Sequence, residues 1–242
     1  MILLDKRRIL AFVLCCCSFL GVISVVWAGV ALPAQTTFLP QIENQQVTWV
    51  IDAGHGGEDG GAISSTGINE SDLNLEIALR LNDMLRFAGE ATSMIRSTEA
   101  AVHTEGDTIR ARKASDIRNR VSHVEKTEGA VLVSIHQNSL PSSPVTYGAQ
   151  VFWNQQEGGE ALAYVVQDTL NAAINIGNEK QAKKIPNTIY LMKHISAPAI
   201  LVECGFLSNL EETERLKDGS YQKKLTAAIS AGCLQALTER ND

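Results

Sequence analysis

Short apolar runs alternate with amphipathic segments from residue 47 onward. Residues 47–52, 130–135 and 199–202 are runs of mostly branched apolar residues, which is typical of strands covered on both faces. Residues 71–88 and 108–126 carry apolar side chains at helical spacing. The expected strands are 47–52, 91–95, 130–135, 148–153 and 199–202, and the expected helices are 71–88, 108–126, 159–176 and 221–237. This alternation predicts an α/β domain with a mostly parallel central sheet flanked by helices.

The first 32 residues follow a different pattern. Basic residues at 6–8 precede an uncharged run, 9–32, which as a helix would reach about 36 Å at about 1.5 Å per residue. Because the hydrocarbon core of a bilayer is about 30 Å thick, this run can span it, with the basic end on the cytoplasmic side. We expect residues 1–32 to be a signal or anchor segment that exports the rest, and both cleavage and retention stay open. Residues 33–46 are predicted to be a linker, and 47–242 a single domain.

Composition narrows the classes of function. The chain of 242 residues has 21 basic and 27 acidic residues and a formal net charge of −6, which argues against sequence-independent nucleic-acid binding. Five cysteines are too few for a disulfide scaffold, and Cys204 and Cys233 are expected to be buried thiols.

Four ionisable residues fall where the predicted strands end or the first long helix begins. His55, His136 and Glu203 follow strands, and Glu70 lies at the start of the helix. Because the carboxyl ends of parallel strands share one edge of a sheet, these side chains are expected to converge.

Two imidazoles and a carboxylate form a ligand set that catalytic zinc uses, so His55, Glu70 and His136 could bind Zn²⁺. Glu203 could then accept a proton from water and return it to a leaving nitrogen. Asn138 could orient a ligand or bind substrate, or could simply form a turn. Each histidine could also be an ordinary hydrogen-bonded residue, and Glu70 a partner of the helix dipole, so the metal site remains a hypothesis.

The stretches that carry these residues resemble the zinc-dependent N-acetylmuramoyl-L-alanine amidase family. The matching stretches are VIDAGHGGEDGGA, NESDLNLEIALRL, VLVSIHQNS, GAQVFW and PAILVECGFLSN. The resemblance implies that His55, Glu70 and His136 bind zinc and that Glu203 is the catalytic carboxylate. It also implies a single α/β catalytic domain over 47–242, which cleaves the amide between the lactyl group of N-acetylmuramic acid and L-alanine in peptidoglycan.

Within this family the chain is most similar to the germination-specific amidases of spore formers, on stretches such as RARKASDIRNRV and IYLMKHISAPAILVECGFLSN. That similarity implies a role in spore cortex maturation, where peptide removal precedes the muramic-δ-lactam needed for germination. It places the domain at the outer face of the cytoplasmic membrane or in the wall compartment, including the forespore cortex space. Since some relatives need a partner lipoprotein, an activating lipoprotein is a candidate partner, as is the membrane if residues 1–32 are retained.

Six basic residues form a further feature, for which a solvated helix face is expected and contact with stem-peptide carboxylates is the alternative. They are Arg96, Arg110, Arg112, Lys113, Arg118 and Arg120. Two other functions stay open for the whole domain: a zinc carboxypeptidase-like hydrolase of the stem peptide, and a non-catalytic wall-binding or regulatory domain.

Overall fold

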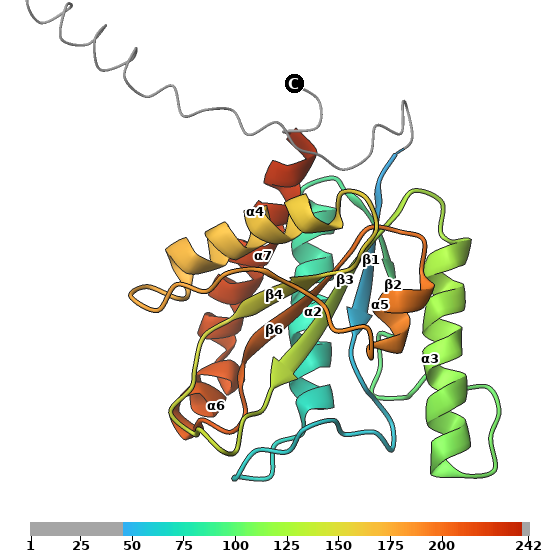
Figure 1. Cartoon of the computed structure of the whole chain (residues 1–242), viewed down its shortest axis with the longest axis horizontal. Coiled ribbons are helices and arrows are strands. Elements are labelled where there is room, and N and C mark those ends of the chain that lie inside the picture. The colour runs from blue at the N-terminus through green and yellow to red at the C-terminus, as the bar shows by residue number, and fades with distance from the viewer. Residues whose placement is uncertain (1–45, 239–242) are drawn as a thin grey trace, which may run out of the picture. The chain divides into compact units, whose positions relative to one another are not determined.

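The computed structural model describes residues 46–238, which form an α/β domain (Figure 1). Its strands are β1 (Thr48–Ala53), β2 (Ala91–Met94), β3 (Ala130–Asn138), β4 (Gln150–Trp153), β5 (Lys183–Lys184) and β6 (Ala199–Phe206). Its helices are α2 (Glu70–Phe87), α3 (Ile109–Lys126), α4 (Gly159–Ala173), α5 (Tyr190–His194), α6 (Leu210–Lys217) and α7 (Gly219–Thr238). The predicted signal or anchor at 1–32, and the predicted linker up to residue 45, lie outside the described residues.

The six strands form one sheet in the order β2-β1-β3-β6-β4-β5. All neighbouring pairs are parallel except β4 with β6, which confirms the predicted mostly parallel sheet. In such a sheet the crevice beyond the carboxyl ends of the strands is the usual place for a ligand.

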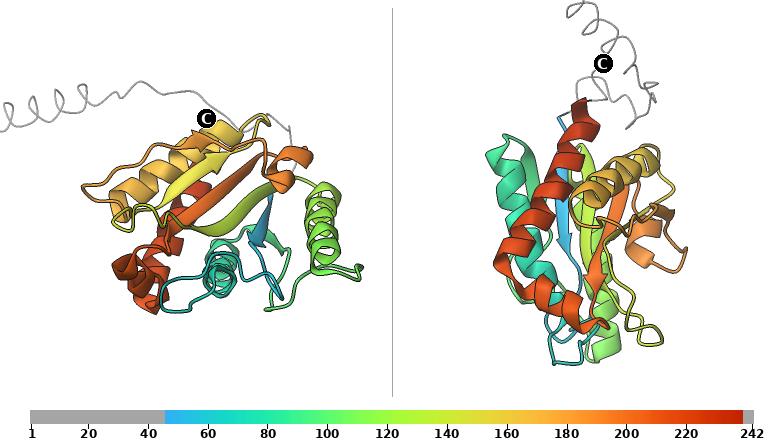
Figure 2. Two further views of the ribbon diagram at one scale, coloured as in Figure 1. Left: turned by 60° about the horizontal axis from the view of Figure 1, so that its bottom comes forward. Right: turned by 90° about the vertical axis from the view of Figure 1, so that its left-hand side faces the viewer.

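Two apolar layers hold the sheet between helices. α2, α4 and α7 pack on one face, where Trp49, Ile51, Val133 and Val202 are buried. The other face, with Leu132 at its centre, is covered by α3 and α5. Figure 2 shows α2 and α7 side by side along the first face. Because both faces are covered, the central strands are apolar throughout, as the sequence pattern indicates.

The helix starts and ends follow local signals. The Thr108 hydroxyl accepts a hydrogen bond from the Ala111 amide and caps α3. The Asn209 side chain caps α6 in the same way, with the Glu212 amide as donor. α2 ends at Phe87, and Gly89 follows two residues later with a φ of 92°, which lies in the left-handed region. Among the described residues, no helix has the length and apolar character needed to cross a membrane.

β3 and β6 extend further than the sequence indicates. The apolar runs end at residues 135 and 202, but strand pairing continues to Asn138 in β3 and Phe206 in β6. His136 and Glu203 therefore lie inside paired strands rather than after them. Their polar side chains break the apolar run but do not end the strand pairing, which depends on backbone amides and carbonyls and continues past a register shift between His136 and Asn138. Three short elements, β5, α5 and α6, were not predicted, because pieces of two to eight residues carry little periodic signal.

Candidate metal centre

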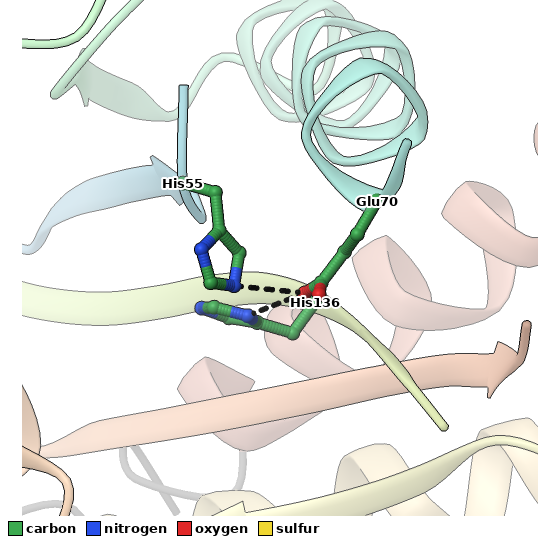
Figure 3. A group of neighbouring side chains, drawn as sticks. All are labelled: His55, Glu70 and His136. Atoms are coloured by element: carbon green, nitrogen blue, oxygen red, sulfur yellow. Dashed lines mark hydrogen bonds and ion pairs between the residues drawn. The ribbon is translucent and has the colours of Figure 1, made fainter. Parts of the chain in front are cut away.

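Three predicted ligands meet at the carboxyl edge of the sheet. His55 follows β1, Glu70 is the first residue of α2, and His136 lies near the end of β3. Figure 3 shows the three side chains pointing toward one another. One possible ligand atom from each residue lies within 4.8 Å of the other two. Residues 81 positions apart in the sequence are thus brought to one point, as the expectation of a shared sheet edge requires.

The Glu70 carboxylate is the centre of this cluster. Its Oε1 lies 2.8 Å from His136 Nδ1 and 3.3 Å from His55 Nε2. The two imidazole rings meet edge to face, with centroids 5.0 Å apart. The amide of Gln137 also donates to Glu70 Oε1, and that of Ala62 to Oε2. The carboxylate is therefore held in one orientation by the backbone as well as by the histidines.

Glycines make room for this convergence. A Cβ atom at Gly54 would lie 2.3 Å from the His136 ring, and one at Gly61 would lie 2.5 Å from Glu70 Oε2. His55 itself has a φ of 62°, a left-handed conformation that is uncommon for residues other than glycine. Residues 54–61, the Gly-rich loop, thus allow the backbone to approach the candidate ligand side chains closely.

Two further polar residues contact the candidate metal ligands, and the sequence analysis singles out neither of them. Asp59 Oδ2 lies 3.0 Å from His55 Nδ1, and its other oxygen contacts Lys113 Nζ at 2.8 Å. Asn74 donates to Glu70 Oε1 and accepts from the Gln137 side chain. Carboxylate and amide partners of this kind fix the orientation of metal ligands. A signal was present for Asn74: it lies four residues after Glu70, among the apolar positions of a helix.

Mutual contacts shift the pKa values of the cluster. Burial disfavours the charged form of His55, but hydrogen bonds and charges from Glu70 and Asp59 outweigh it and raise the pKa to about 9. Burial likewise disfavours ionised Glu70, but hydrogen bonds from His136 and His55 hold its pKa well below the usual range. Glu70 is therefore an anion, which is the form that binds a cation.

Glu203 lies beside the cluster. It is the register partner of His136 in the β3–β6 pair, and both line one pocket of about 350 Å³. Among the described residues its Oε2 is a buried oxygen with no hydrogen-bond partner. Burial is the main cause that raises the pKa of Glu203 to about 7. A buried, unpartnered carboxyl group with this pKa is suited to exchanging a proton with a bound molecule.

The pocket extends beyond the three candidate ligands. Its outer walls come from α3 and α5 and comprise Ile109, Arg112, Lys113, Ile117, Leu191 and Met192. Arg112 and Lys113 are paired with Glu58 and Asp59 of the Gly-rich loop, at 2.6 Å and 2.8 Å. Basic and apolar side chains thus line the pocket beside the ionisable cluster.

The structure corrects the expectation that the six basic residues form a solvated helix face. Arg110 and Arg118 are exposed, as a solvated helix face requires, but Arg96 and Arg120 are only 4% and 2% exposed. The prediction was wrong for these two because the groups that surround them come from distant parts of the chain. Asp52 in β1, for example, pairs with Arg120 across 68 positions.

The remaining predicted residues lie outside the cluster. Asn138 accepts a hydrogen bond from the Ser139 amide at the end of β3 and is not among the residues that line the pocket. Cys204 and Cys233 are buried free thiols, as expected. His103, which the sequence analysis does not single out, also lines the pocket.

The donor set fits a divalent transition metal. Two imidazoles and one carboxylate are a recurrent triad of catalytic zinc sites, which leave further positions for water or substrate. Glu203, whose buried Oε2 has no hydrogen-bond partner within residues 46–238, lines the same pocket. The residues present thus supply both a ligand set and a free acid–base group.

Comparisons with known proteins identify the family of this chain. A family model described as N-acetylmuramoyl-L-alanine amidase matches residues 50–235. The germination-specific N-acetylmuramoyl-L-alanine amidase of Bacillus subtilis is 35% identical over 193 residues, which cover 79% of this chain and 80% of that protein.

Solved structures give the same result. The CwlD amidase of Clostridioides difficile, solved in complex with the GerS lipoprotein, is 31% identical with a TM-score of 0.76, over 80% of this chain and 99% of that one. An N-acetylmuramoyl-L-alanine amidase of Clostridium difficile 630 is 27% identical with a TM-score of 0.70, over 80% and 97% of the two chains.

Proposed function

We propose how the residues of this chain carry out the reaction of its family. The chain belongs to the N-acetylmuramoyl-L-alanine amidase family and has that activity on peptidoglycan. His55, Glu70 and His136 hold a divalent metal, with Zn²⁺ the ion that their donor atoms favour. Glu203 is the general base and then the general acid. The observation that carries the proposal is the meeting of three ligand side chains beside a buried, unpartnered carboxyl oxygen.

The metal would supply Lewis acidity: it polarises the scissile carbonyl and makes water easier to deprotonate. The chain's own residues do the rest. Glu70 Oε1, fixed by the Gln137 amide, keeps the anionic ligand in place, and Asp59 holds the Nδ1 side of His55 so that Nε2 faces the cluster.

Glu203 handles the proton. Its carboxylate accepts a proton from the attacking water, and the protonated form then donates it to the departing nitrogen of L-alanine. A pKa raised to about 7 by burial suits both halves of this exchange, because neither protonation state is strongly disfavoured near neutral pH.

Product analysis tests this function. Purified sacculi are incubated with zinc-loaded wild-type protein, with Glu203→Gln, or with Glu214→Gln, in which an exposed glutamate of α6 is changed. Wild type and Glu214→Gln should release intact stem peptides that begin with L-alanine, detected by mass spectrometry. Glu203→Gln should release at least about 100-fold less while retaining the metal. Release of single amino acids would instead indicate a carboxypeptidase, and no release by any form would contradict the proposal.

The similarity to a germination-specific amidase supports a role in spore cortex maturation. We propose that the chain acts outside the cytoplasm, at the membrane face or in the forespore cortex space, on peptidoglycan that later carries muramic-δ-lactam. Because the CwlD amidase was solved with a lipoprotein, an activating lipoprotein is a candidate partner here as well. Expression in a spore former that lacks its own germination-specific amidase should restore muramic-δ-lactam, and failure with the cognate lipoprotein co-expressed would oppose this role.

A further inference from the structure

Two buried guanidinium groups hold the turn that carries His55. Arg96, which follows β2, donates from Nε to the Ala53 carbonyl at 2.8 Å and from Nη2 to the Gly54 carbonyl at 3.0 Å. Arg120, in α3, donates from Nη1 to the Ala53 carbonyl at 3.0 Å and from Nη2 to the His55 carbonyl at 2.6 Å. Three successive carbonyls at the end of β1 therefore accept hydrogen bonds from arginine side chains.

Arg120 is itself held rigidly. Its Nε donates to Asp116 Oδ2 at 2.6 Å, and its Nη1 also contacts Asp52 Oδ1. These carboxylates neutralise the guanidinium and aim its planar fork, so the donor that reaches the His55 carbonyl has little freedom to move.

Arg96 joins the two segments that carry metal ligands. Besides Ala53 and Gly54, it donates to the carbonyls of Ser71 and Thr98. Ser71 directly follows Glu70, so a single side chain links the turn of His55 to the first turn of α2. The hydrogen bonds recorded for Arg96 within the described residues go to carbonyls rather than to a carboxylate. Burying a cation without a carboxylate partner costs free energy, so stabilisation of the fold is a poor explanation of these four hydrogen bonds. The backbone geometry that Arg96 imposes explains them better.

That geometry is unusual at His55. A left-handed φ is costly for a residue with a side chain and persists only where the surroundings enforce it. We infer that Arg96 and Arg120 are positioning residues that hold the backbone of His55 in this conformation, so that its imidazole already faces Glu70 and His136 when the metal arrives. The inference rests on the proposed function, since it concerns the same metal centre.

The test compares Arg96→Lys and Arg120→Lys with Arg118→Lys in the full-length chain. Lysine keeps the positive charge but has no fork that can serve two carbonyls. Arg118 lies on the same helix as Arg120 and is paired only with exposed Glu105 among the recorded contacts, so it is a matched control. Three quantities are measured: zinc affinity against a competing chromogenic chelator, the visible spectrum at saturating Co²⁺, and the melting temperature of the metal-free protein.

We expect Arg96→Lys and Arg120→Lys to weaken zinc binding by about 10–100-fold, as loss of ligand-orienting contacts commonly does. The Co²⁺ spectrum should change even at saturation, because the ligand geometry has changed, while Arg118→Lys should match wild type in all three measurements. A folded variant is recognised by its metal-free melting transition.

Wild-type zinc affinity and an unchanged Co²⁺ spectrum in either folded variant would overturn the inference. Failure of both variants to fold would overturn it too, because the arginines would then serve the fold rather than the site. Absence of zinc binding in the wild type would overturn the proposed function itself, and is thereby distinguished from failure of the inference alone.

Discussion

His136 and Glu203 are register partners on the neighbouring parallel strands β3 and β6. One residue is a candidate metal ligand and the other a candidate proton carrier. Their adjacency follows from strand pairing in the middle of the sheet, where both strands are buried and the register is strongly specified. Strand pairing thus places a candidate ligand and a candidate acid–base group side by side.

The first prediction concerns Glu203. Glu203→Gln keeps the size of the side chain but removes the proton acceptor, so kcat should fall by about 10²–10⁴-fold. Metal content, measured by elemental analysis, should stay at the wild-type level because Glu203 is not a proposed ligand. A variant with near-normal kcat would show that another group moves the proton.

The second prediction concerns Glu70. Zinc should raise the melting temperature of the wild-type protein, since a ligand present at 100 times its Kd stabilises the native state by about 2.7 kcal/mol. Glu70→Gln, which removes the anionic ligand, should largely lose this shift. The control is Asp83→Asn on the exposed side of α2, which should respond to zinc as wild type does. An equal thermal shift in Glu70→Gln would exclude Glu70 as a ligand.

The third prediction uses the left-handed conformation of residue 55. In the metal-free protein, His55→Gly should be more stable than His55→Ala by about 1 kcal/mol, because glycine adopts positive φ without steric cost. Both variants lack the imidazole, so the comparison isolates the backbone. Chemical denaturation measures the difference, and a more stable alanine variant would show that residue 55 has an ordinary conformation in solution.

The fourth prediction concerns acid stability. Burial opposes the ionised form of Asp52, but Arg120, together with His136 and Ser134, holds its pKa below the usual value of 3.8. A carboxyl group with a lowered pKa in the folded state stabilises the fold fully above its ordinary pKa, and this contribution is lost as the pH falls toward the folded value.

Wild-type protein should therefore lose unfolding free energy as the pH drops below about 4, and Asp52→Asn should lose less over the same range. Urea titrations at several pH values measure this slope. Glu58→Gln, an exposed carboxyl at the pocket rim, is the control. Parallel pH profiles for wild type and Asp52→Asn would contradict the assignment.

Much of this architecture could be predicted from the sequence, and the exceptions have physical causes. Apolar runs located the central strands, since burial on both faces leaves a strong local signal. The same runs ended too early at His136 and Glu203, because a polar side chain can occupy a paired strand when it faces a pocket.

The positions of charged side chains were harder to predict from the sequence than those of apolar side chains. Arg120 lies in a basic helix and was expected on its surface, yet Asp52 and Asp116 allow it to be buried. The i,i+4 spacing of Asp116 and Arg120 within α3 is visible in the sequence, but the pairing of Arg120 with Asp52 is not, because Asp52 comes from β1. Asp59 is the opposite case: it lies four residues after His55, so its role depends on loop geometry rather than on distance along the chain.

The location of the bound metal is the most direct test of the proposed metal centre. A crystal of the zinc-loaded protein, measured on both sides of the zinc absorption edge, gives an anomalous difference map that identifies the ion. The proposed metal centre predicts one strong peak bounded by His55, Glu70 and His136, with Glu203 beside it in the pocket. A peak held by other residues, or no peak in a protein that cleaves peptidoglycan, would contradict it.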